Sequence, residues 1–292
     1  MHDTTIFEYD SVPLDIRTGV LRCVEDLRVH DVTYASPKGG RVPATLVIPA
    51  GDGPFAGILF GHGSAPTGRA NILPYALDLA RTGAVALLID APYVRQQKWP
   101  VTFTPQDAAG QVQLIVDLRR AVDLLLTRAE VDPGRLAYIG HSHGAAMGGL
   151  LAGVERRIGS YVLACGDGGL LSHFSPDGGS AGELDRLPPQ TVREWRAAPE
   201  PIEPIRFVGH AAPAALFFQA ALHDEAVPRT LSEQFFAAGS EPKHLTWYDA
   251  GHVLDEQALH DQVTWLARRI GIDPGRFEFR HGCRRISCFI PP

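Results

Sequence analysis

The run Gly140-His141-Ser142-His143-Gly144 holds the residues of this chain with the clearest capacity for chemistry. An apolar strand pattern over 136–139 precedes it, and a helix start rich in Ala and Gly follows it. A serine at a sharp turn between a strand and a helix is strained, and its hydroxyl is pushed out of the sheet. Glycines flank it because a side chain there would collide with the neighbouring strand and helix. Ser142 is therefore predicted to be a nucleophile.

Residues 178–182 also fit the pattern Gly-x-Ser-x-Gly, with Ser180 at the centre. No strand pattern precedes this segment, and no apolar helix pattern follows it. Because the motif has a mechanism only between a strand and a helix, this second match is rejected.

A serine hydroxyl is a weak nucleophile near neutral pH, so it needs a base within hydrogen-bonding reach and an acid that orients the base. His252 is the predicted base, because it follows a strand pattern and precedes the last amphipathic helix. Asp224 is the predicted acid, since it ends the run that begins at Leu216 and precedes a turn that contains Val227 and Pro228. Asp167, at the exit of the preceding strand, is the rival for that role. The order serine, acid, histidine is the one used with strand-to-helix serines.

The negative charge that develops on a carbonyl oxygen during acyl transfer needs two backbone N–H donors. The amide of His143 is the predicted first donor, because it directly follows the nucleophile at a helix N-terminus. The amide of Ser64 is the predicted second donor. It lies in the loop after the strand pattern at 56–60, where Gly63 lets the backbone approach closely.

Three histidines, His62, His141 and His143, raise the question of a metal site. Two histidines one residue apart across a serine turn point in divergent directions, and no carboxylate or cysteine pattern completes a ligand set. We therefore expect no metal and no cofactor.

The cysteines are Cys23, Cys165, Cys283 and Cys288. They include no Cys-x-x-Cys pair, so zinc-ribbon and thioredoxin-like sites are excluded. We interpret them as reduced thiols of a cytoplasmic protein, with pairing of the last two in the tail as the alternative.

Buried strand patterns and amphipathic helix patterns alternate along the chain and must position these residues. Strand patterns cover 27–34, 42–48, 56–60, 84–89, 136–139, 161–165, 214–221 and 245–248. Helical patterns cover 72–81, 112–125, 231–238 and 254–270. The alternation predicts an α/β fold with a mostly parallel central sheet and helices on both faces.

We expect residues 1–272 to form one domain, with 273–292 as a tail of unknown role. Residues 168–212, between the predicted sixth and seventh strands, are rich in Gly, Pro and charged side chains. A loop of this length in a compact domain is usually functional or disordered. We interpret it as a cap-like insertion over the site, with a surface excursion as the alternative.

Charge and hydropathy exclude several classes of partner. The net charge is −6 and no dense stripe of Lys and Arg is present, which argues against nucleic acid. No apolar run approaches membrane-spanning length, and the N-terminus lacks the features of a signal peptide. We expect a cytoplasmic protein that neither binds nor crosses a membrane. The sequence does not predict an oligomeric state.

Five motifs, at 60–63, 89–92, 140–144, 222–228 and 247–252, together resemble the α/β-hydrolase superfamily. Over about 31–270 the chain is similar to the bacterial dienelactone hydrolase and acyl-esterase branch, near the prolyl oligopeptidase catalytic domain. Dienelactone hydrolases carry a cysteine nucleophile where this chain has Ser142. The roughly fifty residues before the first core strand are too few for the β-propeller of prolyl oligopeptidases.

The resemblance and the residues together predict a serine hydrolase that cleaves carboxylic esters of small or short-chain acyl groups through an acyl-enzyme. Its expected partner is a small-molecule ester. A small peptidase or amidase with the same residues is one alternative. A non-catalytic receptor or scaffold of this fold is another.

Overall fold

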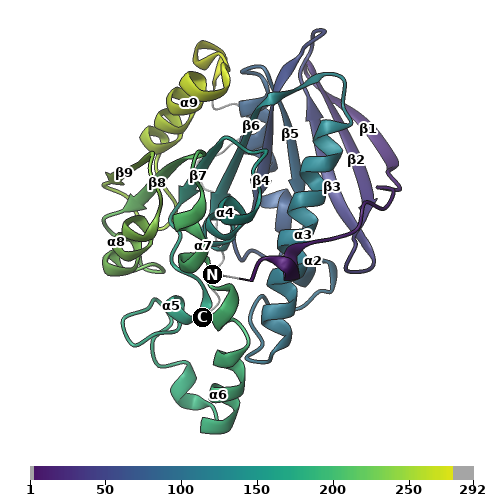
Figure 1. The fold of residues 1–292 in the computed structure, drawn as a ribbon. Coiled ribbons are helices and arrows are strands. Elements are labelled where there is room, and N and C mark those ends of the chain that lie inside the picture. The colour runs from purple at the N-terminus through teal and green to yellow at the C-terminus, as the bar shows by residue number, and fades with distance from the viewer. Residues whose placement is uncertain (1–2, 279–292) are drawn as a thin grey trace.

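A computed structural model describes residues 3–278, and one nine-stranded sheet runs through them in the order β1-β2-β3-β5-β4-β6-β7-β8-β9 (Figure 1). The strands are β1 Arg17–Val24, β2 Leu27–Ala35, β3 Arg41–Ile48, β4 Phe55–Gly61, β5 Ala84–Ile89, β6 Val131–His141, β7 Ser160–Ala164, β8 Ala215–Ala221 and β9 Lys243–Tyr248. Pairing is antiparallel from β1 to β5 and parallel from β5 to β9. The mostly parallel α/β sheet predicted from the sequence is confirmed.

The edge strand β1 is absent from the sequence-based prediction. Its residues are exposed except for a half-buried Val24, so no alternation of buried and exposed positions marks it. Its pairing with β2 makes it a strand. With β1 counted, the insertion at 168–212 lies between the seventh and eighth strands rather than the sixth and seventh.

Helices cover both faces of the sheet, as the alternation of patterns predicts. They are α1 Leu73–Ala80, α2 Pro92–Arg95, α3 Gln106–Leu126, α4 His143–Val154, α5 Leu170–His173, α6 Pro189–Ala197, α7 Pro204–Phe207, α8 Arg229–Ala238 and α9 Glu256–Ile270. One core lies between the sheet and α3, α4 and α8. A second core lies between the opposite face and α1 and α9. The central strands read as continuous apolar runs because both faces are covered.

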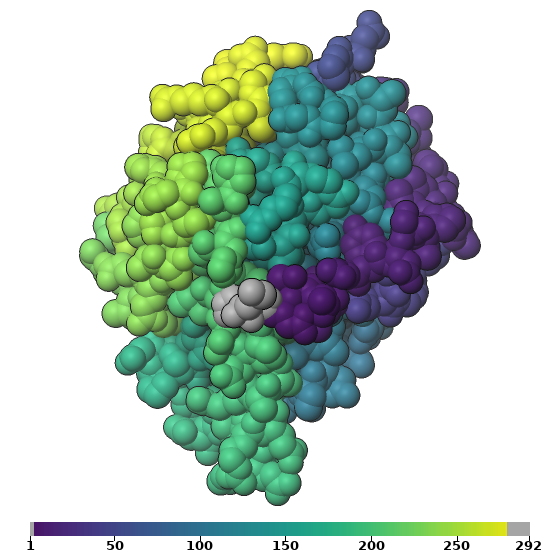
Figure 2. Space-filling view, viewed as in Figure 1, coloured from purple at the N-terminus to yellow at the C-terminus, as the bar shows by residue number. Residues whose placement is uncertain are grey.

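The insertion has two parts with different surroundings. Its first part, with α5 and α6, projects beyond the end of the sheet as a separate lobe (Figures 1 and 2). This lobe has a small core around Phe174 and Trp195, and the indole Nε1–H of Trp195 donates to Asp107 of α3 across 2.8 Å. The second part returns to the main core, where Phe207 packs edge-on against Phe7.

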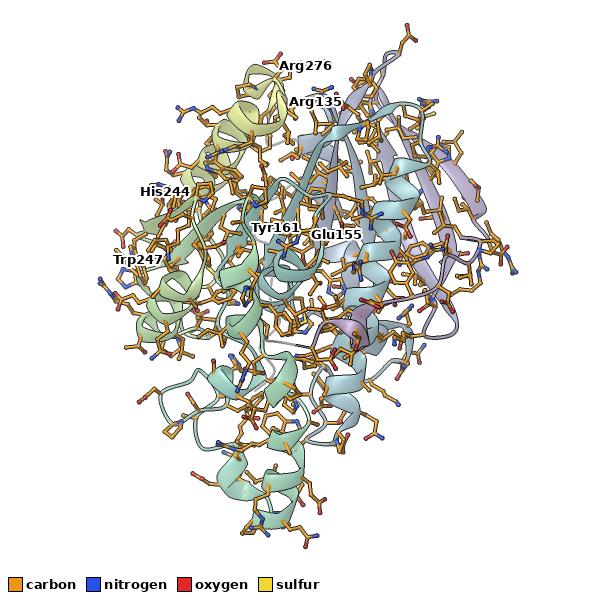
Figure 3. All side chains as sticks on the ribbon, viewed as in Figure 1. Arg135, Glu155, Tyr161, His244, Trp247 and Arg276 are labelled. Atoms are coloured by element: carbon orange, nitrogen blue, oxygen red, sulfur yellow. The ribbon has the colours of Figure 1, made fainter. Side chains whose placement is uncertain are left out.

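A side chain stabilises the turn between α4 and β7. Between α4 and β7, the hydroxyl of the buried Tyr161 donates to the carbonyl oxygen of Glu155 across 3.2 Å (Figure 3).

At the other end of the chain, Phe277 packs edge-on against Tyr75 and closes the second core. The remainder of the predicted tail, including Cys283 and Cys288, lies outside the described residues. Within 3–278, no helix combines the length and apolarity needed to cross a membrane.

Candidate active site

Ser142 lies at the sharp turn between β6 and α4, with φ 55° and ψ −123°. This left-handed backbone conformation is strained for a residue with a side chain. A Cβ at Gly140 would collide with the backbone of Gly144, and a Cβ at Gly144 would collide with the backbone of Gly61. The two glycines therefore permit the approach of strand, helix and loop that fixes the serine turn.

His252 follows β9 and places its ring between Ser142 and Asp224. Its Nε2 lies 2.9 Å from the Oγ of Ser142, and its Nδ1 lies 2.8 and 2.9 Å from the two carboxylate oxygens of Asp224. An ionised carboxylate only accepts, so Nδ1–H donates to Asp224 and Nε2 is left to accept from the serine hydroxyl. The structure thus brings together the three residues that the sequence proposes as nucleophile, base and acid.

Backbone donors hold Asp224 in place after β8. The amides of Ala226 and Val227 donate to its Oδ1 across 2.9 and 2.8 Å. Burial acts to raise the pKa of Asp224, but the hydrogen bonds and charge of His252 and these amides outweigh it and hold the pKa below its ordinary value. An ionised Asp224 is suited to fix the His252 tautomer and to stabilise an imidazolium.

Asp167, the rival acid, contacts a different histidine. Its Oδ2 lies 2.8 Å from Nδ1 of His173, and its Oδ1 accepts from the amide of Gly169 across 3.0 Å. The Oγ of Ser180 lies 3.2 Å from Nε2 of His173. A second chain of serine, histidine and aspartate therefore stands in the insertion, and sequence reasoning missed it because no local motif marks His173.

This second chain differs from the first in ways that bear on chemistry. Ser180 stands in a turn, and its amide donates to the carbonyl oxygen of His173 across 3.2 Å. Burial acts to lower the pKa of His173, but the hydrogen bond and charge of Asp167 outweigh it and raise the pKa above its ordinary value. A histidine with a raised pKa holds its proton more firmly and is a poorer base at neutral pH.

The loop after β4 carries Ser64, and buried groups support it. Nδ1 of His62 donates to the carbonyl of Gly63 across 2.7 Å, and its Nε2 accepts from the amide of Ala91 across 3.0 Å. The hydroxyl of Tyr93 donates to the same carbonyl across 2.8 Å. Burial lowers the pKa of His62, in agreement with a neutral ring that donates once and accepts once. His62 is thus a support for the loop.

The histidines first considered for a metal have other partners. His62 bonds to backbone groups, and Nε2 of His141 lies 2.8 Å from the carbonyl oxygen of His252. Within the described part of the chain, the one group of metal-ligand residues is Cys165, Asp224 and His252, whose ligand atoms lie within 4.8 Å of one another. Two of these residues, Asp224 and His252, form a hydrogen bond with each other.

A cavity of about 250 Å³ opens over Ser142 and reaches both predicted oxyanion donors, Ser64 and His143. Its apolar lining consists of Val101, Ala146, Met147, Leu170, Phe174 and Val227, together with Trp99 and Pro100. Leu170 and Phe174 belong to the insertion, which therefore contributes to the wall of the cavity. Asp167 and His173 also face it.

No family model matches the chain, and no curated protein matches it. Solved structures do. An acetyl xylan esterase from Paenibacillus sp. R4 is 21% identical with a TM-score of 0.70, over 88% of this chain and 90% of that one. The chain has the α/β-hydrolase fold. Acetyl xylan esterase 1 from Thermoanaerobacterium sp. JW/SL YS485 is 16% identical with a TM-score of 0.76, and 90% of each chain is covered. A cold-adapted esterase from an Arctic intertidal metagenomic library is 17% identical with a TM-score of 0.63, over 87% of this chain and 99% of that one.

Proposed function

We propose that this protein is a serine hydrolase that cleaves carboxylic esters of small or short-chain acyl groups. One observation carries the proposal: a single histidine ring lies 2.9 Å from a strained serine at a strand-to-helix turn and 2.8 Å from a buried aspartate. That arrangement is what activates a serine hydroxyl. The names of the similar structures, which include acetyl xylan esterases and an esterase, support the same chemistry.

In the first half of the proposed reaction, the Oγ of Ser142 attacks the ester carbonyl carbon while its proton passes to Nε2 of His252. The carbonyl electrons move onto the oxygen, where the amides of His143 and Ser64 donate to the negative charge. The C–O bond to the alcohol then breaks. The leaving oxygen takes the proton from Nε2, and an acyl-enzyme remains on Ser142.

In the second half, water attacks the acyl carbon and gives one proton to His252. Collapse of the oxyanion breaks the bond to Oγ, which takes that proton back, and the carboxylic acid leaves. Asp224 remains ionised throughout and stabilises the imidazolium that forms twice in the cycle. No step draws on a cofactor.

The preference for short acyl groups rests on the cavity over Ser142. Each methylene buried against an apolar wall contributes about 0.8 kcal/mol, and a methylene beyond the wall contributes nothing. The apolar wall of this cavity, which has a volume of about 250 Å³, supports a preference for a small acyl group.

A panel of p-nitrophenyl esters from acetate to palmitate, with butanoyl p-nitroanilide as the matched amide, tests the proposal. We expect kcat/KM to peak at acyl chains of about two to six carbons, since longer chains leave the apolar wall, and the amide to turn over far more slowly. A rise that continues to palmitate would contradict the short-chain preference. Equal turnover of ester and amide would favour a peptidase or amidase instead.

A further inference from the structure

The peptide between Gly63 and Ser64 carries the second proposed oxyanion donor. It lies in the loop after β4, and it is trans. The N–H of a trans peptide points away from the carbonyl oxygen of the same peptide, so the groups that bind the Gly63 oxygen decide where the Ser64 N–H points. Glycine tolerates most backbone angles, so Gly63 by itself leaves this peptide free to rotate.

Two side chains hold the carbonyl oxygen of this peptide. The hydroxyl of Tyr93 donates to the Gly63 oxygen across 2.8 Å, and Nδ1 of His62 lies 2.7 Å from the same atom. The amide of Ala91 donates to Nε2 of His62, so Nδ1 is the ring nitrogen that carries the proton and donates. Because both donors bind the carbonyl oxygen, the Ser64 N–H is directed away from Tyr93 and His62.

The Ser64 N–H is available to a bound molecule. Within residues 3–278, it donates to no acceptor. Ser64 lines the same cavity as Ser142. Most backbone N–H groups in folded proteins have a partner in secondary structure. An N–H group without one, at the cavity of the nucleophile, has the property that an oxyanion donor needs.

The ring of Tyr93 also contacts the residue that carries the first proposed donor. It packs edge-on against the imidazole of His143, with the ring centroids 5.9 Å apart, and edge-on against His62, with centroids 5.8 Å apart. Tyr93 belongs to α2, and His143 begins α4 directly after the nucleophile. One side chain therefore contacts both segments that carry the proposed donors.

Resting on the function proposed above, we propose that Tyr93 is a positioning residue of the oxyanion site, whose hydroxyl holds the Gly63–Ser64 peptide so that the Ser64 N–H faces the substrate carbonyl oxygen. Without this hydroxyl, His62 is the one side-chain donor left to the Gly63 oxygen among the described residues, and the peptide rotates more freely. A rotated peptide turns its carbonyl dipole toward the developing negative charge and slows formation of the tetrahedral intermediate.

Tyr93→Phe tests the hydroxyl alone, because it keeps the ring against His143. We expect kcat/KM for p-nitrophenyl butanoate to fall about 3- to 10-fold, the value of one hydrogen bond. Loss of a whole oxyanion donor would cost more, about 10²- to 10³-fold in kcat. Tyr161→Phe is the matched control, since it also removes a hydroxyl that donates to a backbone carbonyl, and Tyr161 does not line the cavity. It should keep the wild-type kcat/KM, and circular dichroism checks that both variants are folded.

Two ketones separate orientation of the peptide from contact with the substrate, which matters because Tyr93 also lines the chamber beside α2. A serine hydroxyl adds to 1,1,1-trifluoro-2-hexanone and forms an adduct that bears an oxyanion, whereas 2-hexanone binds without a stable adduct. We expect Tyr93→Phe to raise the inhibition constant of the trifluoro ketone by the factor lost in kcat/KM, and to leave that of 2-hexanone unchanged, since only the adduct resembles the transition state.

An equal rise for the two ketones would overturn the proposal, because it would assign Tyr93 to substrate contact. Unchanged inhibition by both ketones would overturn it as well, and so would a rise for the trifluoro ketone in Tyr161→Phe of the same size. If Ser142→Ala is inactive while Tyr93→Phe behaves as the wild type, the role of Tyr93 fails and the proposed function stands. Absence of any ester turnover in the wild type would contradict both.

Discussion

At the scale of single residues, two chains of serine, histidine and aspartate lie near one cavity, which is lined by Ser142 of the first chain and by Asp167 and His173 of the second. Ser142 has a strained backbone and stands at the start of α4, whereas Ser180 lies in a turn. The difference matters because a helix N-terminus presents free N–H groups to a developing oxyanion. Only the first chain combines the nucleophile with that environment.

A fluorophosphonate is expected to label Ser142 and leave Ser180 unmodified, because Ser142 stands at the N-terminus of α4, whereas Ser180 stands in a turn beside His173, whose pKa is raised. Peptide mass spectrometry after labelling locates the adduct. Ser180→Ala serves as the control and should label like the wild type. An adduct on Ser180 in the wild type would move the proposed nucleophile into the insertion.

Asp224→Asn is expected to reduce kcat at least about tenfold more than Asp167→Asn, because only the acid bound to His252 Nδ1 fixes the tautomer that accepts the serine proton. Steady-state kinetics of the two folded variants make the comparison. Asp167→Asn should act mainly on the orientation of His173. Greater damage from Asp167→Asn would assign the acid to the earlier strand.

The pH profile of kcat/KM should rise with a midpoint at about pH 6–7, as an imidazole base loses its proton. The direction follows from the neutral ring being the active form. Asp224, with its lowered pKa, stays ionised across this range and does not contribute. His173→Gln should keep the rise. A profile that is flat or falls between pH 5 and 8 would argue against a histidine base.

At the scale of elements, a buried carboxyl group joins the first part of the insertion, with α5, to the second part, which begins near α7. Glu203 is 3% exposed, and its Oε2 accepts from the amide of Leu171 at the start of α5 across 3.1 Å. Burial raises the pKa of Glu203 to about 8, so its carboxyl is largely protonated at pH 7. The helix that carries His173 is therefore anchored by a group whose charge changes in a mild pH range.

This anchor predicts a pH-dependent stability. The folded chain holds the Glu203 proton up to about pH 8 whereas the unfolded chain releases it near pH 4.5, so stability falls as pH rises between those values. Relative to Glu203→Gln, the wild-type Tm should fall by roughly 5 °C from pH 5 to pH 8. Thermal unfolding followed by circular dichroism measures the difference. Glu194→Gln, on exposed α6, should behave like the wild type, and parallel curves for Glu203→Gln and wild type would contradict the role of burial.

Much of the secondary structure can be predicted from the sequence, and the elements and residues that the prediction missed have physical reasons. The central strands are continuous apolar runs, and the nucleophile motif is local, so both are readable from the chain alone. The exposed β1 has no such pattern. His173 meets Asp167 and Ser180 only when the insertion folds, and no spacing in the chain encodes those contacts. The roles proposed for Ser142, Asp224, His252, His143 and Ser64 stay predictions that kinetics must test.

At the scale of the whole molecule, the parallel strands deliver the site to one edge of the sheet. Ser142 follows β6, Asp224 follows β8 and His252 follows β9, all at carboxyl ends, where open α/β sheets place their sites. The insertion between β7 and β8 projects beyond the sheet as a lobe (Figure 1), and its Leu170 and Phe174 line the cavity over Ser142. Residues 142 and 252 are far apart along the chain. The order of the strands in the sheet, and not local structure, therefore brings them together.

The central claim is that this site hydrolyses esters through Ser142. Turnover of p-nitrophenyl butanoate by the purified protein, beside Ser142→Ala, measures it directly. We expect wild-type turnover that Ser142→Ala reduces by about 10⁴- to 10⁶-fold in kcat, because nucleophile, base and acid act as one unit. Equal turnover by the two proteins, or none by the wild type, would contradict the claim.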